Sequence, residues 1–135
     1  DLNGNPREVK RADGPSITYL WGYHDSYPIA EIENVTYSEV SSFESNLKLL
    51  SNLDVDNCRT ENCTEQDFRN ALEDLRQAFP HCKVTTYTYD PLRGVTSITS
   101  PRGYTTYYEY DSSNRLIGVK DAKGNYISEY ESNYS

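Results

Sequence analysis

The chain has no methionine, only two histidines and three cysteines, and 36% of its 135 residues are hydrophobic. No apolar run approaches the roughly 18 residues that a membrane-spanning helix needs, and no stretch resembles the core of a signal peptide. We therefore predict no membrane span in this sequence. Because the chain opens on Asp1-Leu2-Asn3-Gly4, within a repeating pattern, we expect it to be a fragment of a longer polypeptide.

Positive charge is also scarce. Thirteen Lys and Arg residues stand against 21 Asp and Glu residues, which gives a formal net charge of −8. A surface this acidic repels phosphate backbones, so a nucleic-acid partner is not expected. Tyrosine is abundant by contrast, with 13 copies, and this aromatic content argues against disorder. A chain of this length is predicted to form a single domain, residues 1–135.

Motifs of known catalytic and metal sites are missing. The sequence has no nucleophile elbow, no zinc-protease motif and no glycine-rich phosphate loop. His24 is expected in a solvated turn. Cys58, Cys63, His81 and Cys82 do not suit zinc, because the adjacent His81 and Cys82 rarely bind one ion. We therefore predict no enzyme activity, no cofactor and no metal site.

A repeat of 21 residues is the strongest signal in the sequence. The segment Tyr87-Thr88-Tyr89-Asp90 recurs as Tyr108-Glu109-Tyr110-Asp111. Thirteen residues after each Asp comes a glycine, Gly103 in one unit and Gly124 in the next. The same register recovers a unit near the N-terminus, in which Trp21 takes the place of Tyr110.

Each unit is predicted to form a β-hairpin. Residues 105–110 are rich in Thr and Tyr, which favours a strand, and Tyr108 and Tyr110 project from one face of it. Residues 111–114 are typical of a turn, and residues 115–120 return as a second strand. We interpret Asp90 and Asp111 as hydrogen-bond acceptors of the turns rather than as catalytic acids.

The returning strands carry an irregular apolar pair, Val95 with Ile98 and Leu116 with Val119. Residues three apart face opposite sides of a regular strand. We therefore predict a β-bulge or a sharp twist within each pair. Gly103 and Gly124 are suited to positive φ in the turns that follow, so the units join as a meander of antiparallel hairpins.

Residues 36–82 interrupt the repeat and are predicted to form two antiparallel helices. A capping box starts the first helix, with Thr36 at the N-cap and Glu39 at N3. The second begins at Thr64 and ends before Pro80. Apolar stripes follow each start: Val40, Phe43, Leu47 and Leu50, then Phe68, Leu72, Leu75 and Phe79. The predicted fold class is α+β: an antiparallel β-meander of repeat hairpins (1–35 and 83–135) with an inserted two-helix hairpin (36–82).

The tyrosines allow two interpretations. If the strand with Tyr87 and Tyr89 lies beside the strand with Tyr108 and Tyr110, their rings form a cross-strand ladder that stabilises the sheet. A second group falls near turns or on the other face, where an open aromatic platform would suit a sugar ring or another protein. That group is Tyr104, Tyr107 and Tyr126.

Three cysteines leave at least one unpaired. Cys58 and Cys63 both lie in the predicted loop between the helices, whereas Cys82 follows the second helix. The separation along that helix is about 22 Å for about 15 residues, well beyond the reach of a disulfide. A Cys58–Cys63 disulfide is therefore favoured in an oxidising compartment, and three free thiols are the alternative.

The Tyr-Asp pattern resembles the YD repeat of Rhs proteins, to which repeats in teneurins and insecticidal toxin-complex subunits are related. The resemblance covers residues 1–35 and 83–131. In that family, arrays of β-hairpins coil into a sheet that forms a hollow shell. Bacterial members are exported or surface-associated, and many carry a C-terminal toxin. Residues 21–32 and the helical insertion look like a variant found in Bacteroidetes surface proteins.

The resemblance implies a non-enzymatic structural and interaction module of a large exported or cell-surface protein. Its partners would be the neighbouring repeats, and its sheet would extend a shell or a surface scaffold. We expect its open edges to self-associate. Carbohydrate or surface-ligand binding through exposed tyrosines is the alternative. The motif residues are expected to be structural: Trp21, Tyr87, Tyr89, Asp90, Gly103, Tyr108, Tyr110, Asp111 and Gly124.

Overall fold

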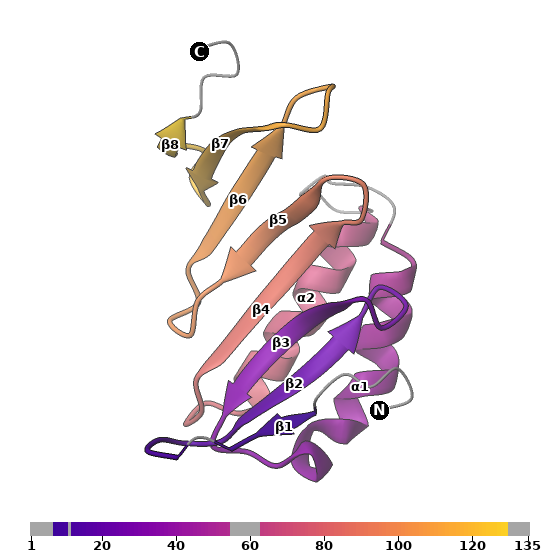
Figure 1. Cartoon of the computed structure of the whole chain (residues 1–135), viewed down its shortest axis with the longest axis vertical. Helices are drawn as coiled ribbons and strands as arrows, with labels where there is room; N and C mark the ends of the chain where they lie inside the picture. Colours follow the sequence, from indigo (N-terminus) through magenta and orange to yellow (C-terminus); the bar gives the residue numbers. More distant parts are fainter. Residues whose placement is uncertain (1–6, 11, 55–62, 130–135) are drawn as a thin grey trace.

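A computed structural model of the chain describes residues 7–10, 12–54 and 63–129. Figure 1 shows a single antiparallel sheet of eight strands whose order in space follows their order in the chain. The strands are β1 (Glu8–Val9), β2 (Ile17–Gly22), β3 (Tyr27–Glu33), β4 (Val84–Asp90), β5 (Gly94–Thr99), β6 (Thr105–Tyr110), β7 (Leu116–Asp121) and β8 (Tyr126–Glu129). Helices α1 (Tyr37–Asn52) and α2 (Thr64–Ala78) are inserted between β3 and β4. The predicted α+β meander with a helical insertion is confirmed.

Polar turns and glycines join the strands as the sequence predicts. Asp111 Oδ1 accepts the backbone N–H groups of Ser113 at 2.8 Å and Arg115 at 3.0 Å, which closes the β6–β7 turn. Gly103 and Gly124 have φ values of +87° and +88°, a left-handed conformation that glycine adopts without steric cost. These turns are short, so each strand pairs with the next one along the chain.

The predicted irregularity of the returning strands is confirmed as a β-bulge. Thr88 pairs with Ser97 but Tyr89 pairs with Val95, so one residue of β5 has no counterpart on β4. The β6–β7 pair shifts in the same way between Glu109 and Tyr110. A third shift occurs in the β2–β3 pair, between Leu20 and Trp21. The bulge is therefore a periodic feature of the hairpins.

Both helices start where the sequence predicts, although the capping box of α1 does not form. Thr36 is the N-cap residue, but its side chain makes no capping hydrogen bond. Its hydroxyl lies 3.0 Å from the hydroxyl of Ser38 instead. The N–H of Tyr37, the first residue of α1, donates to the carboxylate of Glu8. A residue of β1 thus accepts a backbone N–H that has no partner within the helix.

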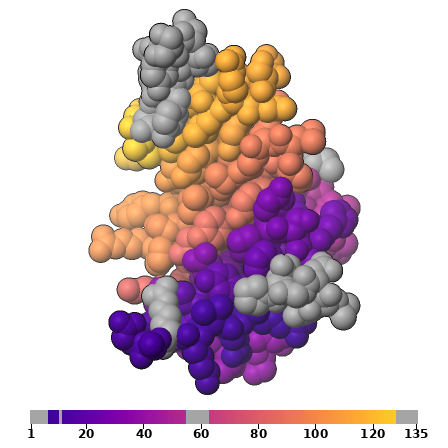
Figure 2. All heavy atoms as spheres, viewed as in Figure 1, coloured from indigo at the N-terminus to yellow at the C-terminus, as the bar shows by residue number. Residues whose placement is uncertain are grey.

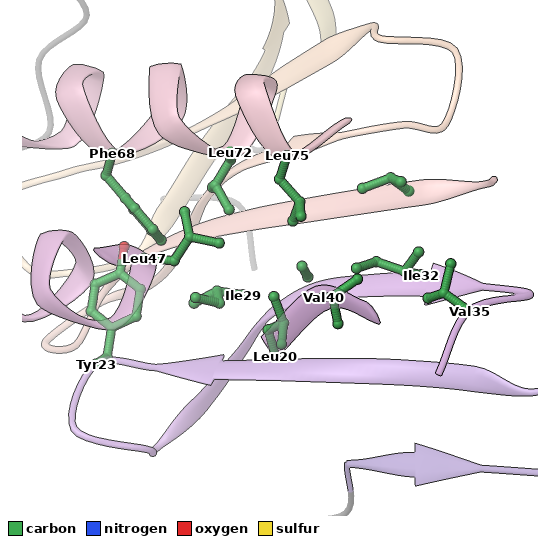
Figure 3. Packing of buried hydrophobic residues seen from close by; sticks show 12 residues of the cluster. Leu20, Tyr23, Ile29, Ile32, Val35, Val40, Leu47, Phe68, Leu72 and Leu75 are labelled. Atoms are coloured by element: carbon green, nitrogen blue, oxygen red, sulfur yellow. The ribbon is translucent and has the colours of Figure 1, made fainter. Parts of the chain in front are cut away.

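The two helices cover one face of the first half of the sheet (Figure 1), and the hydrophobic core lies between the helices and the sheet. Phe68, Leu72 and Leu75 of α2 point toward residues of β2 and β3 (Figure 3). Among the described residues, the buried core cluster draws on β2, β3, β4 and the helical insertion: Leu20, Tyr23, Ile29, Ala30, Ile32, Val35, Val40, Leu47, Phe68, Leu72, Leu75 and Val84.

The second half of the sheet extends beyond the helices. In Figure 2 the strands β6 to β8, in orange and yellow, form the upper part of the molecule, away from the N-terminal half. The C-terminal hairpins are thus held mainly by contacts from one hairpin to the next.

No helix in the described part of the chain is long and apolar enough to cross a membrane.

One predicted arrangement is wrong. The strands that carry Tyr89 and Tyr110 are not neighbours, because β5 lies between β4 and β6. In a meander each tyrosine strand pairs with its own returning strand, so equivalent strands of successive units are next-nearest neighbours. Instead of forming a direct ladder, the ring of Tyr89 stacks on Tyr27 and Tyr87, and the hydroxyl of Tyr110 bonds the carbonyl of Val95 on the adjacent β5.

Candidate functional site

Two tyrosine hydroxyl groups link consecutive hairpins. Tyr89 Oη donates to the carbonyl of Pro28 at 2.9 Å, and Tyr110 Oη donates to the carbonyl of Val95 at 2.6 Å. The two acceptors hold equivalent positions, since Pro28 pairs with Trp21 and Val95 pairs with Tyr89, each beside a bulge. We call each contact an inter-hairpin tyrosine bond. It recurs with the same 21-residue period as the sequence motif.

Gly94 makes room for the second of these bonds. A Cβ atom at this position would lie 3.0 Å from Tyr110 Oη, closer than side chains normally approach. Gly94 also has a φ of +142°, which L-amino acids with a side chain rarely adopt. The end of the β4–β5 turn is thus shaped to receive the tyrosine of the following strand.

The tyrosine bonds form where neighbouring hairpins diverge. Strands β3 and β4 pair from Ala30 with Thr86 to Ile32 with Val84, and β5 and β6 pair from Ser97 with Tyr107 to Thr99 with Thr105. Toward the bulged ends no further pairs form between these strands. Each tyrosine hydroxyl spans the gap and replaces backbone hydrogen bonds that the divergence removes.

Tyr23 fills the first gap, between β3 and β4. Its side chain is 4% exposed, its hydroxyl donates to Asp54 Oδ2 at 2.6 Å, and it accepts the Tyr89 N–H at 2.8 Å. Its ring meets Phe68 and Tyr89 edge-on, with centroids 5.8 and 5.5 Å away. Burial, followed by the charge of Asp54, raises the pKa of Tyr23 far above its usual range.

The rings of three half-buried tyrosines, Tyr27, Tyr87 and Tyr89, stack on one another. Tyr89 stacks on Tyr27 at a centroid distance of 4.7 Å and on Tyr87 at 6.3 Å. Burial raises the pKa of Tyr87 to about 12, with a further contribution from the carboxylate of Glu31. Burial also raises the pKa of Tyr89 and, to a smaller extent, that of Tyr110. These hydroxyl groups are therefore neutral hydrogen-bond donors at physiological pH.

The two motif aspartates lie in turns. Asp90 Oδ1 accepts the Leu92 N–H at 3.0 Å, as Asp111 Oδ1 accepts those of Ser113 and Arg115. The backbone N–H of Arg115 is the main cause that lowers the pKa of Asp111. Both carboxylates thus accept hydrogen bonds from the backbone of their turns.

The remaining motif residues occupy the strands and turns of the repeat. Tyr108 pairs with Val119 across β6 and β7, and Trp21 pairs with Pro28 across β2 and β3. Arg93 Nε donates to Asn114 Oδ1 at 2.9 Å, which joins two turns that are one repeat apart. These two side chains, which are 21 residues apart, therefore meet at the turn ends.

The three tyrosines expected as a ligand platform lie in different surroundings. Tyr104 is 74% exposed beside a hollow of about 500 Å³ that Ile127 also lines. The guanidinium of Arg69 lies 5.3 Å from the ring centroid of Tyr107, and Lys120 Nζ lies 4.6 Å from that of Tyr126. One ring face of Tyr107 and one of Tyr126 are thus already occupied by a cation.

Two of the cysteines can be placed. Cys63 is disulfide-bonded, and Cys82 has a free thiol packed against the core. Cys58 lies outside the described residues, so its pairing with Cys63 stays a prediction. In the part of the chain that the structure covers, no group of His, Cys, Asp and Glu side chains is arranged to hold a metal ion.

Sequence reasoning missed Tyr23 and Glu65. Glu65 is 1% exposed, and its carboxylate binds Arg69 Nη1 at 2.6 Å and the Thr96 hydroxyl at 2.5 Å. The spacing of Glu65 and Arg69 predicts an ion pair on one helix face. Nothing in the sequence indicates its burial, because that depends on how far α2 covers the sheet.

Comparison with known families agrees with the geometry. The RHS Repeat family model matches residues 92–126, which run from the β4–β5 turn to the first residue of β8. No curated protein and no solved structure matches the chain. The matched segment contains the bulged β6–β7 hairpin and the Tyr110–Val95 bond described above. Residues 92–126 therefore match a model of the RHS Repeat family, which supports the resemblance that the Tyr-Asp pattern indicated.

Proposed function

We propose that the chain is a non-enzymatic structural and interaction module of a large exported or cell-surface protein, in which it extends a continuous repeat sheet. The observation that carries this proposal is the pair of inter-hairpin tyrosine bonds, Tyr89 to Pro28 and Tyr110 to Val95. Each bond joins the second tyrosine of the motif to a carbonyl beside the bulge of the preceding hairpin. Further repeats at either end of the sheet can add the same contact.

The exposed end of the sheet supports this role. In the described part of the chain β8 has one strand neighbour, β7. Ile127 of β8 is 61% exposed and lies at a fourth register shift, between Val119 and Lys120 of its partner strand. An apolar strand edge of this kind favours pairing with another strand.

Two observations support a location outside the cell or on its surface. Rhs repeats are typical of extracellular and surface-associated proteins. The disulfide of Cys63 is the kind of bond that persists in oxidising compartments.

Sedimentation velocity tests the proposal. An excised module with edges built for further repeats is expected to self-associate as its concentration rises. Ile127→Lys places a charge on the β8 edge and is expected to weaken that association. Leu49→Lys is the matched control, since Leu49 is 56% exposed on helix α1 and is not part of the β8 edge. A wild-type chain that stays monomeric at high concentration would contradict the proposal.

Glycan binding keeps one specific observation in its favour, the exposed Tyr104 beside the 500 Å³ hollow. A sugar ring that stacks on Tyr104 would shift the resonances of Gly103 and Asn125, which line the same hollow. Titration of oligosaccharides with wild type and Tyr104→Ala tests this alternative. Shifts that survive the substitution exclude this site as the location of binding.

A further inference from the structure

The β2–β3 turn has an unusual backbone. Tyr23, His24 and Asp25 have φ values of +53°, +59° and +62°. Residues with a side chain rarely adopt this left-handed conformation, which costs glycine nothing. Among the described turns, no other contains more than one such non-glycine residue. Contacts from elsewhere in the fold must therefore hold this turn in place.

The turn also lacks the carboxylate that organises the equivalent turn one hairpin further along the matched repeat. In the β6–β7 turn, Asp111 Oδ1 accepts the backbone N–H groups of Ser113 and Arg115. Gly22 stands at the position of this motif aspartate. The N–H groups at the start of the β2–β3 turn therefore need acceptors from another element.

Side chains at the C-terminal end of α1 supply these acceptors. Ser51 Oγ accepts the N–H of Tyr23 at 2.9 Å, and Asn52 Oδ1 accepts the N–H of His24 at 2.7 Å. Both acceptors belong to the last turn of the helix. The insertion thus takes over the function that the motif aspartate has in the β6–β7 turn.

An ion pair holds the third left-handed residue. Lys48 Nζ lies 2.5 Å from Asp25 Oδ1, and the two side chains are about 30% exposed. Lys48 precedes Ser51 by about one helical turn, so it lies on the same side of α1. Each of the three left-handed residues is therefore in contact with this end of the helix.

The turn sets the position of Tyr23. The ring of Tyr23 is buried against Phe68 and Tyr89, and its hydroxyl accepts the N–H of Tyr89 at 2.8 Å. The pairs between β3 and β4 end at Ala30 with Thr86, so this ring closes the gap beyond them. A change of the turn backbone that moves Tyr23 would open the gap.

We propose that the β2–β3 turn is a latch, which α1 holds closed over the gap between β3 and β4 and which opens when this end of the helix moves. In the closed state, contacts with Lys48, Ser51 and Asn52 offset the unfavourable left-handed backbone. Without them the turn relaxes, Tyr23 leaves the gap and the N–H of Tyr89 meets water. The helical insertion therefore controls access to the sheet, whether or not the sheet edges extend.

Amide hydrogen exchange of the full chain, followed by NMR, tests the latch. The N–H of Tyr89 is expected to exchange by local opening, and therefore faster than the N–H of Leu72, which is buried in α2 and exchanges by global unfolding. Equal protection of these two N–H groups in the wild type would overturn the proposal, because the turn would then open only when the whole fold unfolds.

Asn52→Ala removes one contact from α1. It is expected to speed exchange of the Tyr89 N–H about fivefold, the effect of one lost hydrogen bond. Asn70→Ala is the matched control, since Asn70 is an exposed residue of α2 that bonds Gln66 on its own helix. This control is expected to leave the exchange of Tyr89 unchanged. An Asn52→Ala variant that exchanges at the wild-type rate would contradict the latch.

His24→Gly tests the left-handed backbone itself. Glycine adopts a positive φ without steric cost, so the closed turn is expected to become more stable and exchange of the Tyr89 N–H to slow about threefold. Lys123→Gly, at an exposed position of the β7–β8 turn, is the control and is expected to slow nothing. Faster exchange in His24→Gly would show that the turn stores no backbone strain and would overturn the proposal.

Discussion

Single hydroxyl groups carry much of the connection between hairpins. Tyr108 and Tyr110 lie on the same strand and face, yet only the hydroxyl of Tyr110 bonds a carbonyl of the preceding hairpin. Tyr108 lies opposite Val119 of β7 in the strand register. In this unit the second tyrosine of the motif therefore makes the bond to the preceding hairpin.

Tyr110→Phe tests the bond while it keeps the ring. Loss of one hydrogen bond to a part-buried carbonyl is expected to lower the free energy of unfolding by about 1 kcal/mol. Tyr108→Phe is the matched control and is expected to change it by less than about 0.5 kcal/mol. Urea unfolding followed by circular dichroism measures both. Equal effects of the two substitutions would show that the hydroxyl of Tyr110 has no special role.

Alkaline pH tests the burial of the tyrosine stack. The folded state raises the pKa of Tyr87 to about 12, and an exposed tyrosine has a pKa of about 10. Its contribution to stability is therefore complete below about pH 10 and is lost as the pH rises through about 12, because the unfolded state releases its proton first. Tyr87→Phe removes this contribution.

The free energy of unfolding should consequently fall less steeply between about pH 10 and 12 in Tyr87→Phe than in the wild type. Urea unfolding at a series of pH values gives both slopes. Identical slopes would mean that Tyr87 ionises equally readily in the folded and unfolded chains.

At the level of elements, the insertion depends on close approach between α1 and β2. A Cβ atom on Gly22 would lie 2.5 Å from Ser51 Oγ and 2.9 Å from a methyl group of Ile29. Ser51 Oγ also accepts the N–H of Tyr23 at 2.9 Å, which fixes the residue that fills the first gap. Gly22 stands where the repeat motif has Asp, so the substitution makes room for the helix.

Gly22→Ala is expected to destabilise the fold by roughly 1–3 kcal/mol through overpacking. Gly103→Ala is the comparison, because a Cβ atom there would meet no other atom within 4 Å. This substitution is expected to destabilise the fold only through backbone strain, by about 1 kcal/mol. Thermal and urea unfolding measure both. A smaller effect at position 22 than at position 103 would contradict the close packing of α1 on β2.

Most elements could be predicted from local signals. The start residues Thr36 and Thr64 and the bulges within the apolar pairs follow from residue type and spacing, and the structure confirms them. The prediction that β4 and β6 are neighbouring strands was wrong. The period of a repeat does not tell whether another strand lies between the equivalent strands of two units. Tyr23 and Glu65 were missed because their burial depends on how the helical insertion packs on the sheet.

At the level of the whole molecule, the chain combines two ways to hold a sheet. Strands β2 to β4 have a helix-backed core, whereas β6 to β8 lie beyond it (Figure 1). The RHS Repeat match falls on the second part. We interpret the helical insertion as a hydrophobic support for one end of the repeat sheet. Each further hairpin is then stabilised by contacts with the hairpin before it.

Duplication of one repeat tests this central claim most directly. A second copy of residues 90–110, one full period, inserted after Tyr110 adds a turn, a β5-like strand and a β6-like strand. If each hairpin is coupled to the last, the enlarged chain should unfold in one urea transition with a larger m-value, since more surface becomes buried. The same insert with its tyrosine at position 110 changed to Ala is the control, and it should lose that gain. An unchanged m-value, or rapid hydrogen exchange throughout the inserted residues, would contradict the claim.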